Sequence, residues 1–228
     1  MEMHDAALAV VTSGQSSFGA QLAELHATCS GLKAWLANHV SDGTEHCRRL
    51  CGGHGFSSSS NLGHLFAETV GACTYEGTFD VLVQQHARYL LKMLAAASAG
   101  QATDSSTAFL AHASTNASST LRCSAVKATD LADPALLLEA FRVRAARVIL
   151  ALAAKMRATN GDANACMVLM TRASAAHAEL LLLEALVRGA DQVPRGKERA
   201  AVELLGAIFG AWLVVNALGG FRESDWCK

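Results

Sequence analysis

Apolar residues recur at intervals of three and four positions along most of this 228-residue chain. Such intervals place side chains on one face of an α-helix. The first long helix is predicted from Gln21, and it is expected to end at residues 41–44, a run of Ser, Asp, Gly and Thr. Six residues form the apolar face of this predicted helix: Leu22, Leu25, Cys29, Leu32, Leu36 and Val40.

Short helices are predicted on both sides of a cluster of glycines. Thr44 can cap a helix that runs to Leu50. The sequence Gly-Gly-His-Gly at residues 52–55 then ends that helix, because glycine tolerates positive φ. Further helical segments are predicted at residues 5–11, 62–69 and 81–92.

A change of composition divides the chain. Ser, Thr, Ala, Gly and Asn dominate residues 98–119, which predicts a linker. Beyond it, Asp133 and Pro134 suit the N-cap and the first turn of a helix. Three long helices are predicted there, the first closed by Asn160 and Gly161 and the others at 163–188 and 197–218, packed as an antiparallel bundle. The expected organisation is a helical bundle at 1–97, a linker at 98–130 and a second helical domain at 131–228.

The composition favours helices and excludes some partners. Hydrophobic residues make up 51% of the chain but aromatic residues only 6%, and Ala and Leu dominate, so we predict an all-α fold. The 19 Lys and Arg balance 20 Asp and Glu, which provides no basic footprint for nucleic acid or an anionic membrane. The charge-free stretch 204–221 contains several glycines, so we expect a buried helix there and no membrane span.

The seven cysteines include no C-x-x-C pair, which indicates free thiols in a reducing compartment. Cys47, Cys51, His54 and Cys73 lack the spacing of a structural zinc site, so no metal is expected. The serine run at 57–60 lacks the Gly-x-Ser-x-Gly elbow of a hydrolase. None of these side chains is therefore a strong candidate for chemistry.

Glu76 is the candidate for acid–base chemistry. It lies between Tyr75 and Gly77, on a short loop that leads into the helix predicted from Val81. Backbone geometry at such a place can aim a carboxylate into a pocket, where it can act as a base. The alternative is that Glu76 is only a favourable partner of the helix dipole.

The glycine cluster is the second candidate. Gly52, Gly53 and Gly55 let the backbone approach a ligand closely, and exposed amides around His54 can cradle a phosphate. The alternative is a plain sharp turn, the commoner use of glycine. Because the cluster follows a helix rather than a strand, it is not a dinucleotide-binding fingerprint.

Several segments, read in order and spacing, carry a family resemblance. In the first half they are Leu25-His26, Gly31-Leu32-Lys33-Ala34, Cys47-Arg48 with residues 51–57, Cys73-Thr74-Tyr75-Glu76-Gly77, and Ala87-Arg88-Tyr89-Leu90 with Lys92; in the second half they are residues 138–147 and 172–177. Together they resemble the C-terminal half of the peroxisomal acyl-CoA oxidases, members of the acyl-CoA dehydrogenase-like flavoprotein superfamily. Acyl-CoA dehydrogenases share the glycine loop and the Tyr-Glu-Gly segment but lack the second helical domain.

The resemblance implies FAD-dependent oxidation of fatty acyl-CoA to trans-2-enoyl-CoA, with O2 reduced to H2O2, as the first step of peroxisomal fatty acid β-oxidation. Glu76 matches the family's glutamate that removes the α-proton. The resemblance also implies a homodimer in the peroxisome, in which the glycine loop approaches the FAD diphosphate and adenosine, usually across the dimer interface. The residues matched to FAD binding are Gly52, Gly53, His54, Gly55, Gly77 and Thr78.

Some features depart from the family pattern. Thr78-Phe79-Asp80 stands where the family usually has an acidic residue, Asn and Thr. The family's N-terminal helical domain and middle β-domain would precede residue 1, and a C-terminal Ser-Lys-Leu signal is lacking, so a chain clipped at both ends is expected. The alternative function is a non-catalytic helical dimerisation or scaffold protein, a relict of the same fold.

Overall fold

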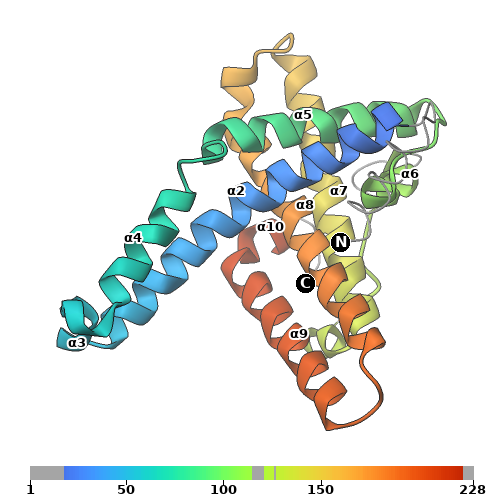
Figure 1. The fold of residues 1–228 in the computed structure, drawn as a ribbon. Helices are drawn as coiled ribbons and strands as arrows, with labels where there is room; N and C mark the ends of the chain where they lie inside the picture. Colours follow the sequence, from blue (N-terminus) through green and yellow to red (C-terminus); the bar gives the residue numbers. More distant parts are fainter. Residues whose placement is uncertain (1–17, 115–120, 126, 223–228) are drawn as a thin grey trace. The chain divides into compact units, whose positions relative to one another are not determined.

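A computed structural model describes residues 18–114, 121–125 and 127–222 (Figure 1). Every regular element among these residues is a helix, which confirms the all-α prediction. The short helix predicted at 5–11 lies outside the described residues. The chain divides into two compact units, Met1–Tyr89 and Leu90–Lys228. This division falls inside helix α5 (Phe79–Ser98), earlier than the composition change after residue 97.

The first unit is organised along one long helix, α2. The prediction that this helix ends at residues 41–44 was wrong, because α2 continues without a break to Leu50. Glycine at position 43 lowers helix stability by only about 1 kcal/mol relative to alanine, and the hydroxyl of Thr44 donates to the Val40 carbonyl at 2.8 Å inside the helix. The other elements of this unit, besides the start of α5, follow α2 (Phe18–Leu50) and are α3 (Gly53–Phe56), η1 (Ser58–Ser60) and α4 (Leu62–Ala72).

The apolar face predicted for α2 is not its buried face. Leu22, Leu36 and Val40 are exposed, whereas Ala27, Ser30, Gly31 and Ala34 are buried. Small side chains let two helix backbones approach closely, so packing overrides hydrophobicity here. Ala34 joins Leu82 and Val83 of α5 in one cluster, and Gly31 lies directly against the ring of His86.

After the end of α5, the second unit continues with packed short helices and not with an open loop. In the segment expected to be a linker, the side chains of Thr107, Leu110, Ala113 and Leu121 are buried. These residues belong to, or lie close to, η2 (Ser105–Thr107) and α6 (Phe109–Ser114), and η3 (Ala128–Ala132) follows. The segment therefore contributes to the core of the unit.

Three long helices form the rest of the second unit, and their predicted starts are confirmed. Asp133 caps the first by accepting from the Ala135 amide at 2.8 Å, with Pro134 at its first position. Asp162 caps the second by accepting from the Asn164 amide at 2.9 Å. The helices are α7 (Pro134–Ala158), α8 (Ala163–Gln192) and α9 (Lys197–Asn216), followed by α10 (Leu218–Arg222).

The core of this unit lies between α7, α8 and α9. α8 packs against both of the other helices, and the fully buried side chains include Phe141, Ile149, Leu152, Met170 and Leu180. Among the described residues, α8 is the helix long and apolar enough to cross a membrane. Because 56% of its most apolar window is buried inside the protein, α8 has the character of a core helix. The antiparallel order of the three helices stays a prediction.

Candidate functional site

Glu76 lies in the turn between α4 and α5 and adopts an unusual backbone conformation. Its φ is +58°, in the left-handed region, and its side chain is exposed. Residues other than glycine seldom adopt positive φ, at a cost of about 1 kcal/mol or more. Strained residues of this kind cluster at functional sites, where the surrounding structure holds them in place.

Lys33 of α2 binds the backbone of this turn. Its ammonium group donates to the Tyr75 carbonyl at 2.8 Å and also to the Gly77 carbonyl. These two carbonyls flank Glu76, so a single lysine fixes the backbone on both sides of the candidate base. Charge-assisted hydrogen bonds of this kind are stronger than neutral ones.

Gly77 and Thr78 complete the turn. Gly77 has φ +104°, and a Cβ at this position would lie 2.9 Å from a methyl group of Leu82. Glycine is therefore required here by both conformation and space. Thr78 is exposed, and its carbonyl accepts from the Leu82 amide at 3.1 Å, which starts α5.

We expect Lys33→Met to loosen the turn around Glu76 without unfolding the unit. Methionine retains much of the apolar stem but removes both hydrogen bonds to the backbone. Amide hydrogen exchange at Tyr75 and Leu82, whose N–H groups donate to Gly71 and Thr78 on either side of the turn, should accelerate about tenfold, as expected when an interaction of about 1.4 kcal/mol is lost. Lys92→Met, at an exposed lysine of α5, serves as the matched control. Unchanged exchange in Lys33→Met would remove Lys33 from this role.

The glycine cluster forms a tight loop after α2. Gly52 has φ +54°, and neither Gly52 nor Gly53 has an atom within 4 Å of where a Cβ would stand. His54 is exposed beside them. Gly55 is buried, and its Cβ would lie only 1.9 Å from the Arg48 carbonyl oxygen. The cluster thus has an open part, Gly52 to His54, and a packed part, Gly55.

Ion pairs stabilise the C-terminal end of α2, which immediately precedes this loop. Glu45 accepts from Arg48 and Arg49, each with a closest contact of 2.7 Å. The hydrogen bonds from these two arginines lower the pKa of Glu45 to about 2. The Arg48 guanidinium also lies 5.6 Å from the centre of the Phe66 ring of α4. The C-terminal end of α2, against which Gly55 packs, is therefore stabilised both by the Glu45 ion pairs and by the contact of Arg48 with Phe66.

The structure does not bring the two candidate sites together within one chain. Gly52–Gly55 precede α4, and Glu76 follows it (Figure 1). A helix of 11 residues at 1.5 Å per residue separates its ends by about 16 Å. One chain therefore presents the glycine loop and the Glu76 turn at opposite ends of α4.

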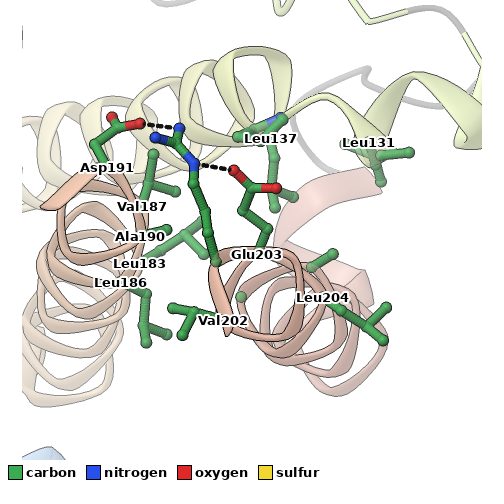
Figure 2. A pocket seen from close by; sticks show the side chains of 15 residues that line it. Leu131, Leu137, Leu183, Leu186, Val187, Ala190, Asp191, Val202, Glu203 and Leu204 are labelled. Atoms are coloured by element: carbon green, nitrogen blue, oxygen red, sulfur yellow. Dashed lines mark hydrogen bonds and ion pairs between the residues drawn. The ribbon is translucent and has the colours of Figure 1, made fainter. Parts of the chain in front are cut away.

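The second unit contains an apolar pocket of about 390 Å³, shown in Figure 2. Its walls include Leu137, Leu183 and Val202. Arg199 lies at its edge and bonds Asp191 at 2.6 Å and Glu203 at 2.7 Å. None of the site residues predicted from the sequence lines this pocket.

Comparison with known proteins agrees with the sequence resemblance. A family model described as the acyl-CoA oxidase C-alpha1 domain matches residues 1–91. A second model, described as acyl-CoA oxidase, matches residues 133–228. Both candidate sites, the glycine loop and Glu76, lie inside the first match.

Individual relatives match almost the whole chain. The putative peroxisomal acyl-coenzyme A oxidase 1.2 of Arabidopsis thaliana is 34% identical over 217 residues, which is 92% of this chain and 32% of the relative. The structure of Arabidopsis thaliana acyl-CoA oxidase 1 has a TM-score of 0.86 at 32% identity, over 95% of this chain and 33% of its own. Acyl-CoA oxidase-1 of Caenorhabditis elegans, complexed with FAD and ATP, has a TM-score of 0.85 at 25% identity, over 100% of this chain and 34% of its own.

The 228 residues thus span about a third of the length of the relatives that they match. Two family models in the expected order, a relative at 34% identity and two closely superposable structures agree with one another. The chain belongs to the acyl-CoA oxidase family and corresponds to the C-terminal part of such a protein.

Proposed function

We propose that this chain supplies the base and part of the flavin site of a peroxisomal acyl-CoA oxidase. The reaction is the oxidation of a fatty acyl-CoA to trans-2-enoyl-CoA with reduction of O2 to H2O2. The observation that carries the proposal is Glu76, held at positive φ by Lys33 in a chain of the acyl-CoA oxidase family. The peroxisomal location follows the names of relatives such as the Arabidopsis oxidase.

Glu76 takes the α-proton in this proposal. The thioester carbonyl acidifies the α-carbon, and the exposed Glu76 carboxylate is available to a substrate that approaches the turn. The proton moves to a carboxylate oxygen of Glu76 while the double bond forms between the α- and β-carbons. The Lys33 hydrogen bonds keep the backbone of the base fixed, which favours one orientation of the side chain.

The residues matched to FAD fit that role in part. Gly52 and Gly53 leave open space beside the backbone, and His54 is exposed next to them, so all three can contact a diphosphate or adenosine group. Gly55 instead shapes the loop by packing on Arg48. FAD held there would supply the acceptor for the hydride that leaves the β-carbon, with O2 as the final acceptor of the two electrons. Thr78 is exposed two residues after Glu76, so it is the candidate for a contact with FAD on this side of the site.

A homodimer is part of the proposal. The glycine loop and the Glu76 turn stand about 16 Å apart along α4, so the two segments of one chain are poorly placed for a single reacting centre. Two subunits in which one supplies the glycine loop and the other supplies Glu76 remove this difficulty. Light scattering coupled to size-exclusion chromatography measures the assembly directly.

A chimaera tests the function. The segment of Arabidopsis thaliana acyl-CoA oxidase 1 that this chain matches is replaced by these 228 residues, and peroxide release from a fatty acyl-CoA is measured. We expect a flavin-containing protein that releases peroxide in step with enoyl-CoA. A chimaera that folds and binds flavin but releases no peroxide, beside an active parent enzyme, would support the non-catalytic alternative.

A further inference from the structure

Two glycines of α9, one helical turn apart, have different surroundings. A Cβ on Gly210 would lie 2.5 Å from a methyl carbon of Leu137, so α9 lies directly against α7 at this point. Gly206, one turn earlier, is also buried, but a Cβ there would meet nothing within 4 Å. Gly206 lines the apolar pocket of about 390 Å³ in the second unit (Figure 2). The lack of a side chain at Gly206 therefore keeps this pocket open.

The floor of the pocket is apolar and well packed. Leu137 of α7 and Leu183 and Ala190 of α8 all line it, and each is at most 5% exposed. Pockets that bind small molecules have volumes of about 300–1,000 Å³. An apolar cavity of only about 150 Å³ already binds benzene. The pocket therefore has room for an apolar group larger than a benzene ring.

Three charged side chains also line the pocket, and they favour one kind of head group. Arg199 bonds Asp191 at 2.6 Å and Oε1 of Glu203 at 2.7 Å, so the three side chains together have a charge of −1. The second carboxylate oxygen of Glu203, Oε2, has no partner among the described residues and can accept a hydrogen bond. A carboxylate head group would be repelled here, whereas an ammonium group would find both an acceptor and a favourable charge.

We propose that this pocket binds the aliphatic chain of a medium-length primary amine, with its ammonium group at Glu203. Burial of the chain against the apolar floor supplies most of the affinity, and each added methylene should tighten binding about threefold to fourfold. The charged side chains supply the selectivity. Because these side chains are between 25% and 62% exposed, the preference for ammonium over carboxylate should be about two- to fivefold. Neither Glu76 nor the glycine loop lines this pocket, so the proposal is independent of the oxidation.

Titration calorimetry of the 228-residue chain at neutral pH tests the proposal, with octylamine as the probe. Octan-1-ol and octanoate have the same chain length and differ in the head group, so they measure the selectivity. Octylamine should bind most tightly and octanoate most weakly. Hexylamine, with two methylenes fewer, should bind about tenfold more weakly than octylamine.

Gly206→Leu should abolish binding of octylamine, because the leucine side chain fills the space that the ligand needs. Gly189→Leu is the matched control, since Gly189 is exposed on α8, does not line the pocket, and its Cβ would also meet nothing within 4 Å. This variant should bind octylamine as the unmodified chain does. Equal binding by the two variants, or no binding by the unmodified chain, would overturn the proposal.

A second pair of variants keeps the test decisive if Gly206→Leu folds poorly. Glu203→Gln should remove the preference for octylamine over octanoate and leave the binding of octan-1-ol unchanged. Glu198→Gln, at an exposed glutamate of the same helix that does not line the pocket, should retain the preference. Octanoate binding as tightly as octylamine to the unmodified chain would rule out the ammonium assignment. A dimer that becomes monomeric in Gly206→Leu, seen by light scattering, would show that a second copy of the chain occupies the pocket instead.

Discussion

Glu76→Gln should lower peroxide release in the chimaeric oxidase by about a thousandfold while the flavin stays bound. General base catalysis typically contributes about 10²–10⁴-fold to a rate. Glutamine has nearly the same shape as glutamate but cannot take the α-proton. The turn should survive, because Lys33 bonds the carbonyls of Tyr75 and Gly77 and not the Glu76 side chain.

Glu68→Gln is the matched control for this variant. Glu68 is an exposed glutamate of α4 that pairs with His64, at 3.5 Å, four residues earlier on the helix. Its loss should leave peroxide release unchanged. If Glu76→Gln and Glu68→Gln retained equal activity with equal flavin content, another residue would have to be the base.

Gly31→Ala should destabilise the first unit by about 2–3 kcal/mol. A Cβ at this position would stand 2.0 Å from Nδ1 of His86, and that imidazole is completely buried. Either the ring must move or α2 and α5 must separate, and forcing extra volume into a packed core costs about 1–3 kcal/mol or more. Urea denaturation together with hydrogen exchange in α2 measures the loss.

Gly43→Ala, in the same helix, should have the opposite sign. No atom lies within 4 Å of its added Cβ, and the residue is exposed and helical. Alanine should therefore stabilise α2 by about 0.5–1 kcal/mol through helix propensity alone. A double variant that combines Gly31→Ala with His86→Ala should lose less than the sum of the two single losses, because removal of the imidazole makes room for the added Cβ. Additive losses would mean that Gly31 and His86 do not compete for space.

Local rules predicted the starts of the three long helices of the second unit well. Asp133 and Pro134 mark the start of α7, since capping depends on a few neighbouring residues. The inward faces of these helices, for example at Phe141 and Leu180, follow simple helical periodicity. Both features depend only on the sequence close by.

The first unit shows where local rules fail. Hydrophobicity predicted that Leu22, Leu36 and Val40 of α2 are buried, but they are exposed. The face of α2 that contacts α5 instead contains the small residues Gly31 and Ala34. The role of Lys33 was equally hidden, because its partners are backbone carbonyls 42 and 44 residues away. Periodicity contains no information about such distant partners. Glu76 and the glycine loop were identified as candidate site residues from the order and spacing of the segments that resemble the acyl-CoA oxidases.

Anaerobic reduction of the flavin tests the central claim most directly. Mixing the flavin-loaded chimaera with a saturated fatty acyl-CoA in the absence of oxygen isolates the chemical step from reoxidation. We predict that the oxidised-flavin absorbance disappears in the chimaera with Glu76 and persists in Glu76→Gln. Bleaching at the same rate in both proteins would contradict the assignment of Glu76 as the base.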